Sequence, residues 1–97
     1  MVWVDPPTFY PQTYTKGHDK HHMEHAKAMG LTFREWLKEA SDTLNSEDRE
    51  IVKWMKGREY FALNKTNNRL AVGAPEGDIN TYFILHKSRR RYYIPRK

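Results

Sequence analysis

Hydrophobic positions between residues 33 and 44 recur every three or four residues. The apolar residues of this stretch are Phe33, Trp36, Leu37, Ala40 and Leu44. This spacing places them on one face of an amphipathic helix. Thr32, just before the run, and Glu35, three residues later, have the pattern of a capping box. The sequence therefore predicts a helix that starts after Thr32 and ends near Asn45 or Ser46.

Two further helices are predicted on either side of this one. Residues 19–29 can form the first, because Gly30 is of the type that often follows the end of a helix. Ser46 can cap a third helix, which Gly57 would end. The buried side of this third helix would consist of Ile51, Trp54 and Met55.

Beyond Gly57 the pattern changes to short aromatic and aliphatic runs separated by turn residues. The runs are "REYFALN", "RLAVGA" and "INTYFILHK", with "KTNN" and "PEGD" between them. Such runs are typical of antiparallel strands joined by short turns. In residues 79–85 apolar side chains occupy both parities, which predicts a strand covered on both faces and central in its sheet. After the arginines, "YYIP" is predicted to be a last short strand or an extended tail.

Helices followed by strands are typical of an α+β fold, and 97 residues are enough for one compact domain. We expect two or three N-terminal helices packed on a three- to four-stranded antiparallel sheet within residues 17–97. Residues 1–16 are expected to form an extended arm, because their prolines disfavour helix. The aromatic residues that could dock this arm on the domain are Trp3, Phe9, Tyr10 and Tyr14.

The charge of the chain is positive and unevenly distributed. Lysine and arginine number 17 against 12 acidic residues, a net charge of +5, and no acid follows Leu85. This balance predicts a polyanionic partner: a nucleic acid, an acidic membrane surface or an acidic protein. No apolar run is long enough to span a membrane. The absence of cysteine excludes disulfides and thiolate metal ligands.

Four of the five histidines lie between residues 18 and 25, in "KGHDKHHMEHAKAMG". On a helix, His18, either His21 or His22, and His25 recur every three or four residues and would share a face. His21 and His25 could bind one metal ion, but no complete ligand set is visible, so we expect neither a metal nor a cofactor. Alternatively, the histidines form a solvated helix face. A third interpretation is acid–base catalysis, because an unperturbed imidazole has a pKa of about 6.5.

The order of the motifs "HHMEHAKAMG", "TFREWLKEASDTL", "REYFALNKTNNRLAVG" and "EGDINTYF" is familiar. Over residues 18–94 the chain resembles the small toxin domains of bacterial polymorphic-toxin and contact-dependent-inhibition systems. More broadly, it resembles the barnase/EndoU/colicin/RelE (BECR) superfamily of metal-independent ribonucleases.

This resemblance implies an antibacterial toxin endoribonuclease that needs no metal. The RNA, with tRNA among the candidate substrates, would be cleaved by attack of a 2′-hydroxyl on the adjacent phosphate. The toxin would be secreted or delivered into the cytoplasm of a target cell, where a cognate, acidic immunity protein would neutralise it. A non-catalytic nucleic-acid-binding module and a small histidine-metal domain are the alternatives.

The resemblance also assigns roles to individual residues. His25 in "EHAKAMG" matches the helix histidine of such toxins, and Thr81 in "INTYF" matches their strand hydroxyl. Many relatives have lysine directly before this histidine, where this chain has Glu24. Phosphate binding would then fall to other cations. The remaining candidates are His21 and His22 for catalysis, and Lys20, Arg89, Arg90, Arg91, Tyr82 and Tyr93 for substrate binding.

The catalytic hypothesis makes a geometric prediction. The first helix should pack against the strand that carries Thr81, with an imidazole within about 8 Å of the threonine hydroxyl, so that one phosphate can bridge them. Strict alternation would place Thr81 on the same face as Ile79 and Phe83, where a buried hydroxyl requires a polar partner.

Overall fold

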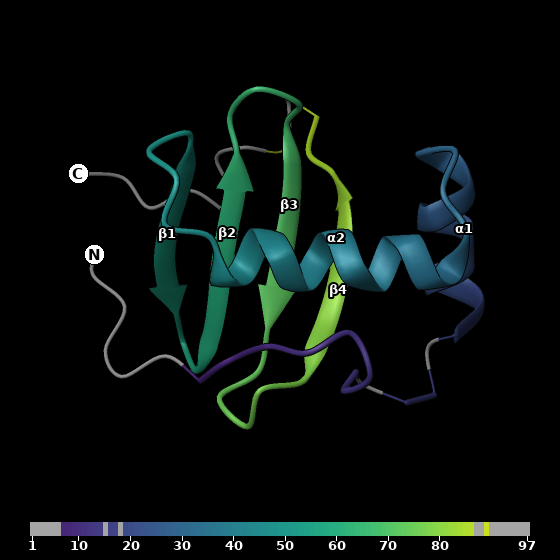
Figure 1. Ribbon diagram of the computed structural model, residues 1–97, viewed down its shortest axis with the longest axis horizontal. Helices are drawn as coiled ribbons and strands as arrows, with labels where there is room; N and C mark the ends of the chain where they lie inside the picture. Colours follow the sequence, from purple (N-terminus) through teal and green to yellow (C-terminus); the bar gives the residue numbers. More distant parts are fainter. Residues whose placement is uncertain (1–6, 15, 18, 87–88, 90–97) are drawn as a thin grey trace.

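Residues 7–14, 16–17, 19–86 and 89 are described by a computed structural model (Figure 1). The elements in chain order are α1 (Asp19–Ala28), α2 (Phe33–Asn45), β1 (Ile51–Lys56), β2 (Glu59–Asn64), β3 (Arg69–Gly73) and β4 (Ile79–Ile84). The strands form an antiparallel sheet of order β1-β2-β3-β4. Helix α2 crosses one face of the sheet, and α1 lies beside β4. This is the predicted α+β architecture.

The helix predicted from local signals is confirmed in detail. The Thr32 hydroxyl accepts a hydrogen bond from the Glu35 backbone N–H at 3.2 Å, and the Glu35 carboxylate accepts one from the Thr32 N–H at 2.9 Å. Ser46 caps the other end. These bonds satisfy backbone N–H groups that the first turn of a helix leaves without partners. Local chemistry therefore fixes the start of α2, and packing of its apolar face on the sheet holds it there.

The third predicted helix is wrong, because residues 51–56 form strand β1. The two-residue loop Gly57–Arg58 joins β1 to β2, with Lys56 paired to Glu59 and Gly57 at φ +64°. A glycine in the first loop position suits a two-residue hairpin. Six residues are too few for periodicity to distinguish a strand from a helix. Ile51 and Met55 pack on the α2 side of the sheet and Trp54 on the other, which is the strand alternation.

The prediction that residues 79–85 form a central strand is also wrong, because β4 is an edge strand of the described sheet. Apolar residues of this segment nevertheless pack on both faces, although Ile84 is exposed. Tyr82 packs under α2, whereas Phe83 and Leu85 pack on the opposite face. Helix α1 lies alongside the outer edge. The sequence pattern suggested a further strand beside β4. In the structure, helix α1 lies there instead.

A β-bulge interrupts the alternation of β4. Gly73 pairs with Ile79 and Val72 pairs with Thr81, so Asn80 is an extra residue on β4. Ile79 and Tyr82 consequently pack in the same cluster under α2, although they are three residues apart. Thr81 therefore does not share a face with Ile79, as strict alternation predicted. It lies on the side of Phe83, in a pocket with it.

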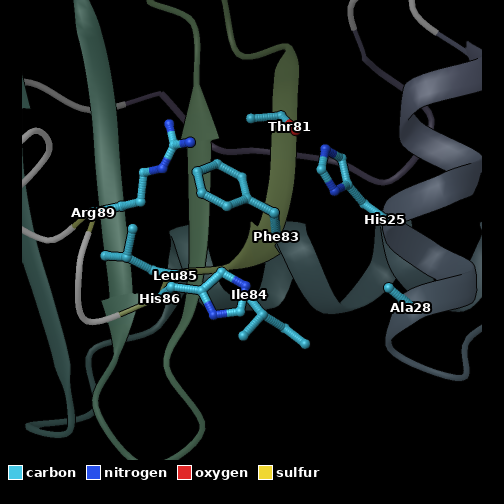
Figure 2. A pocket seen from close by; sticks show the side chains of 8 residues that line it. All are labelled: His25, Ala28, Thr81, Phe83, Ile84, Leu85, His86 and Arg89. Atoms are coloured by element: carbon cyan, nitrogen blue, oxygen red, sulfur yellow. The ribbon is translucent and has the colours of Figure 1, made fainter.

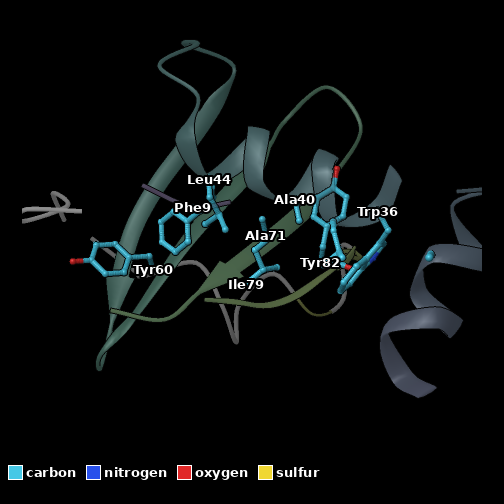
Figure 3. Close-up of a cluster of buried hydrophobic side chains, with 11 residues drawn as sticks. Phe9, Trp36, Ala40, Leu44, Tyr60, Ala71, Ile79 and Tyr82 are labelled. Atoms are coloured by element: carbon cyan, nitrogen blue, oxygen red, sulfur yellow. The ribbon is translucent and has the colours of Figure 1, made fainter. Parts of the chain in front are cut away.

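The segment 7–14 completes the core rather than lying outside it. Phe9 is 1% exposed, and its ring covers Gly73 so closely that an added Cβ there would lie 2.3 Å from it. The Asn45 side chain accepts from the Phe9 N–H at 2.9 Å and donates to the Phe9 carbonyl at 2.7 Å. Figure 3 shows Phe9 between Leu44 and Tyr60 in this cluster. The expected docking of Tyr14 also occurs, by a parallel bridge to Ile79. Tyr10 is exposed, while Trp3 and "YYIP" lie outside the described residues.

Candidate functional site

A pocket of about 640 Å³ opens between α1 and β4 (Figure 2). Its polar lining residues are His25 from α1, Thr81 from β4, and His86 and Arg89 from the segment that follows β4. Phe83 and Leu85 contribute much of its apolar surface. A volume of this size is typical of small-ligand sites, in which a few polar groups converge on a mostly apolar cavity.

His25 projects from α1 toward β4 and is half-buried. Burial lowers the pKa of His25 below its usual 6.5, because an imidazolium loses hydration there. The neighbouring His21 lowers it further, and the Glu24 carboxylate partly opposes both effects. The neutral imidazole is therefore favoured near neutral pH, and this is the form that can accept a proton.

Thr81 reaches the same pocket from β4, as the sequence predicted for the pair His25 and Thr81. Both side chains line the cavity, and Figure 2 shows the His25 ring projecting toward the strand that carries Thr81. The bulge at Asn80 is what turns Thr81 to this side of the sheet. Two groups that are far apart in the sequence thus meet at one cavity.

His86 and Arg89 enter the pocket from the end of β4. The Leu85 N–H donates to the Asn68 carbonyl at 2.7 Å, and the Arg89 N–H donates to the His86 carbonyl at 2.9 Å. Both side chains line the cavity. Arg89 was predicted from its charge. No catalytic or substrate-binding role was predicted for His86, although its position directly after the last strand, in a basic segment, was a usable signal.

His22 lies in the core and not at the pocket. It is 2% exposed, and its Nε2 lies 2.8 Å from the Asn80 carbonyl oxygen. Because a carbonyl can only accept, Nε2 carries the proton of this bond. The ring stacks on Trp36, with centroids 4.9 Å apart and an interplanar angle of 30°. Such burial contradicts the expectation that His22 exchanges protons with a substrate.

His21, in contrast, is exposed to solvent. Its side chain is 75% exposed, lies 3.8 Å from the Glu24 carboxylate and does not line the pocket. It acts on the site through its charge, by lowering the pKa of His25. A direct role in catalysis remains a prediction. His18, the first histidine of the cluster, lies outside the described residues.

Tyr82 does not bind substrate in this arrangement, which corrects the sequence prediction. Its side chain is completely buried, and its hydroxyl donates to the Glu39 carboxylate at 2.5 Å. The same carboxylate forms an ion pair with Arg69. Burial, followed by the bond to Glu39, raises the pKa of Tyr82 well above its usual value. The tyrosine is therefore a protonated donor that joins β4 to α2 and β3.

Of the other predicted substrate-binding residues, the structure places only Lys20, and it does not line this pocket. Lys20 lines a separate, mostly apolar groove of about 720 Å³ between α1 and the start of α2. Arg90, Arg91 and Tyr93 lie outside the described residues. Within the described part of the chain, no cluster of three or more His, Cys, Asp or Glu side chains is arranged to hold a metal ion. No described helix is long and apolar enough to cross a membrane.

Comparisons of the chain with protein-family models, curated protein sequences and solved structures return no significant match. A fold alone does not define a function. What the protein does must therefore be inferred from the pocket and from the chemistry of the side chains that line it.

Proposed function

We propose that this protein is an endoribonuclease whose pocket binds RNA and cleaves it without a metal ion. One observation supports the proposal above the others. Two imidazoles, those of His25 and His86, line one cavity together with the Thr81 hydroxyl and the Arg89 guanidinium. A general base, a general acid, a hydrogen-bonding hydroxyl and a fixed cation are the groups that cleavage of an RNA phosphodiester requires.

In the proposed reaction His25 removes the proton from a ribose 2′-hydroxyl. The 2′-oxygen forms a bond to the adjacent phosphorus while the bond from phosphorus to the 5′-oxygen breaks. His86 gives a proton to that leaving oxygen, so the products are a 2′,3′-cyclic phosphate and a free 5′-hydroxyl. The lowered pKa of His25 supports its role as the base, because the ring is neutral before the reaction.

Arg89 and Thr81 would act on the phosphate itself. A guanidinium stabilises the additional negative charge that develops on the phosphoryl oxygens, and a hydroxyl can donate to one of them. Phe83 offers an aromatic face beside His25 on which a base can stack. The net charge of +5 supports a polyanionic substrate in general terms.

The test uses short RNA, two chemically matched control substrates and a chelator. DNA and RNA with 2′-O-methyl groups lack the attacking hydroxyl and should remain uncut, and EDTA should leave cleavage unchanged. His25→Ala and His86→Ala should each abolish most cleavage while RNA binding persists. Wild-type protein that binds RNA without cutting it would overturn the proposal and favour a non-catalytic nucleic-acid-binding module.

The biological setting is a separate proposal that rests on the resemblance of the motifs to toxin domains. An antibacterial ribonuclease would stop growth when it is expressed inside bacteria, and a cognate immunity protein would restore growth. A partner with an acidic surface would be complementary to the basic chain and could cover the pocket. Expression of the wild type and of His25→Ala tests this setting, because only the wild type should be toxic.

A further inference from the structure

A buried imidazole forms a hydrogen bond between helix α1 and β4. His22 is 2% exposed and donates from Nε2 to the carbonyl of Asn80, the residue that forms the bulge. The bulge determines that Thr81 lies on the pocket side of β4. The hydrogen bond from His22 therefore holds the strand at Asn80, the residue directly before Thr81.

The His22 ring is itself held by its neighbours. It stacks on Trp36, and Tyr14 contacts it edge-on with the centroids 6.5 Å apart. Trp36 in turn donates from its indole N–H to the Tyr82 carbonyl at 2.8 Å. The carbonyls on both sides of Thr81 thus accept bonds from two rings that stack on each other.

The same imidazole also sets how α1 lies on the sheet. His25 is three residues beyond His22, so the two side chains emerge from adjacent positions on the helix surface. A helix anchored at His22 presents His25 to the pocket, while the anchored strand presents Thr81. One bond therefore aligns two pocket side chains that come from different elements.

We propose that His22 is a positioning residue, which fixes the bulge of β4 and the placement of α1 and does not touch the substrate. Its effect on cleavage rests on the proposed ribonuclease function, whereas its effect on β4 does not. The role differs from that of His25, although both are histidines of one cluster. The Nε2–H group is the feature that matters, and proton exchange with a ligand is not required.

Two substitutions separate this role from catalysis. His22→Gln retains an N–H donor at a similar distance from the backbone, and His22→Leu has a similar apolar body without a donor. Backbone hydrogen exchange of residues 80–83, measured by NMR without RNA, should accelerate by about tenfold in the leucine variant. The glutamine variant should stay close to the wild type.

Cleavage kinetics provide the second measurement. His22→Leu should lower kcat by about tenfold or more, since small displacements of reacting groups reduce the rate strongly. His22→Gln should retain most of the wild-type kcat, and the acid limb of its pH profile should be unchanged. A glutamine variant as inactive as the leucine variant, with normal hydrogen exchange, would identify His22 as catalytic and overturn the proposal.

The wild-type protein supplies a test that does not depend on how well the variants fold. The ring ¹⁵N shifts of His22 should show the proton on Nε2, with slow exchange of that proton. A neutral ring protonated only at Nδ1 would overturn the proposal. If the wild type cut no RNA, the ribonuclease function would fail, and hydrogen exchange of β4 would still decide whether His22 positions the strand.

Discussion

The rings of His25 and Phe83 lie 5.7 Å apart between centroids, with their planes inclined by 35°. The imidazole that we propose as the base is thus adjacent to an aromatic surface in the same pocket. A nucleobase that stacks on Phe83 would bring its ribose toward His25. This relationship makes Phe83, rather than the buried Tyr82, the aromatic residue expected to contact RNA.

The first prediction is that Phe83→Leu weakens RNA binding. Loss of a stacking platform costs about 1–3 kcal/mol per base when alanine replaces an aromatic residue, and leucine should fall toward the lower end of that range. Phe83→Tyr, which retains the ring, is the matched control. Fluorescence anisotropy with labelled RNA on a His25→Ala background measures binding without cleavage. Equal affinities for leucine and phenylalanine would show that no base stacks there.

The second prediction concerns two charges that act on His25 in opposite directions. His21→Ala should raise the pKa of His25, because a neighbouring positive charge disappears. Glu24→Gln should lower the pKa, because the carboxylate favours the imidazolium. NMR titration of the ring measures both. Lys38→Ala on α2, whose partner is Asp42, is the control and should leave the titration unchanged. Shifts of the same sign in both variants would contradict this account.

The third prediction follows from the lowered pKa of His25. The acid limb of kcat/KM should have its midpoint below pH 6.5, because the base must be neutral. The free energy of unfolding should also depend on pH through His25. Between the folded and unfolded pKa values the unfolded chain binds more protons, so stability rises with pH and is lost as pH falls through that window. The effect is small because the ring is only half-buried.

Urea unfolding at several pH values, compared with His25→Gln, isolates this contribution. The free energy of unfolding of the wild type, relative to that of His25→Gln, should decrease as the pH falls below 6.5. It should remain constant above pH 7.5. A wild type whose advantage increases as the pH falls would have the opposite linkage, and the pKa of its His25 would have to be raised.

The fourth prediction separates structure from substrate binding at Tyr82. Tyr82→Phe removes the hydroxyl that donates to the Glu39 carboxylate, so the unfolding free energy should fall by about 1.5–3 kcal/mol. Cleavage of RNA under conditions where both proteins are folded should not change. Tyr10→Phe, at a side chain that is 56% exposed, should alter neither quantity. A loss of affinity for RNA in Tyr82→Phe would restore the original expectation that this tyrosine binds substrate.

The fifth prediction tests how tightly the segment 7–14 is packed. Gly73→Ala would place a methyl group 2.3 Å from the Phe9 ring, and overpacking of this kind costs about 1–3 kcal/mol. Phe9→Leu should relieve part of the clash. Chemical unfolding of the two single variants and the double variant forms a cycle, in which the double variant should lose less than the sum. If the changes in unfolding free energy were strictly additive, the two residues would not be in steric contact.

Local signals predicted α2 well, and pairing between distant residues explains most of the errors. The capping box of Thr32 and Glu35 and the regular apolar spacing lie within one stretch of sequence. Strand β1 was mistaken for a helix because Ile51, Trp54 and Met55 fit one face of a helix as well as a strand covered on both sides. Only the pairing with β2 decides between them.

The site was predicted where it depends on residue type and missed where it depends on register. His25, Thr81 and Arg89, which were predicted from residue type and charge, line the candidate pocket. The bulge at Asn80 arises from the pairing of β4 with β3, which no local pattern reveals. It places Tyr82 under α2 and Phe83 at the pocket. His86 lines the pocket directly after β4, and only its position in a basic segment after the last strand could have suggested this.

The small contact surface of α1 affects when this helix can fold during synthesis of the chain. This helix has ten residues and buries only His22 and Ala26 among those described, and isolated helices of that length are marginal in water. It leaves the ribosome before every strand. Although α1 also contacts α2, the element it contacts most, β4, is the last strand of the described sheet. We therefore expect α1 to remain largely unfolded on the nascent chain until residues 79–84 emerge, so that the pocket does not exist before then.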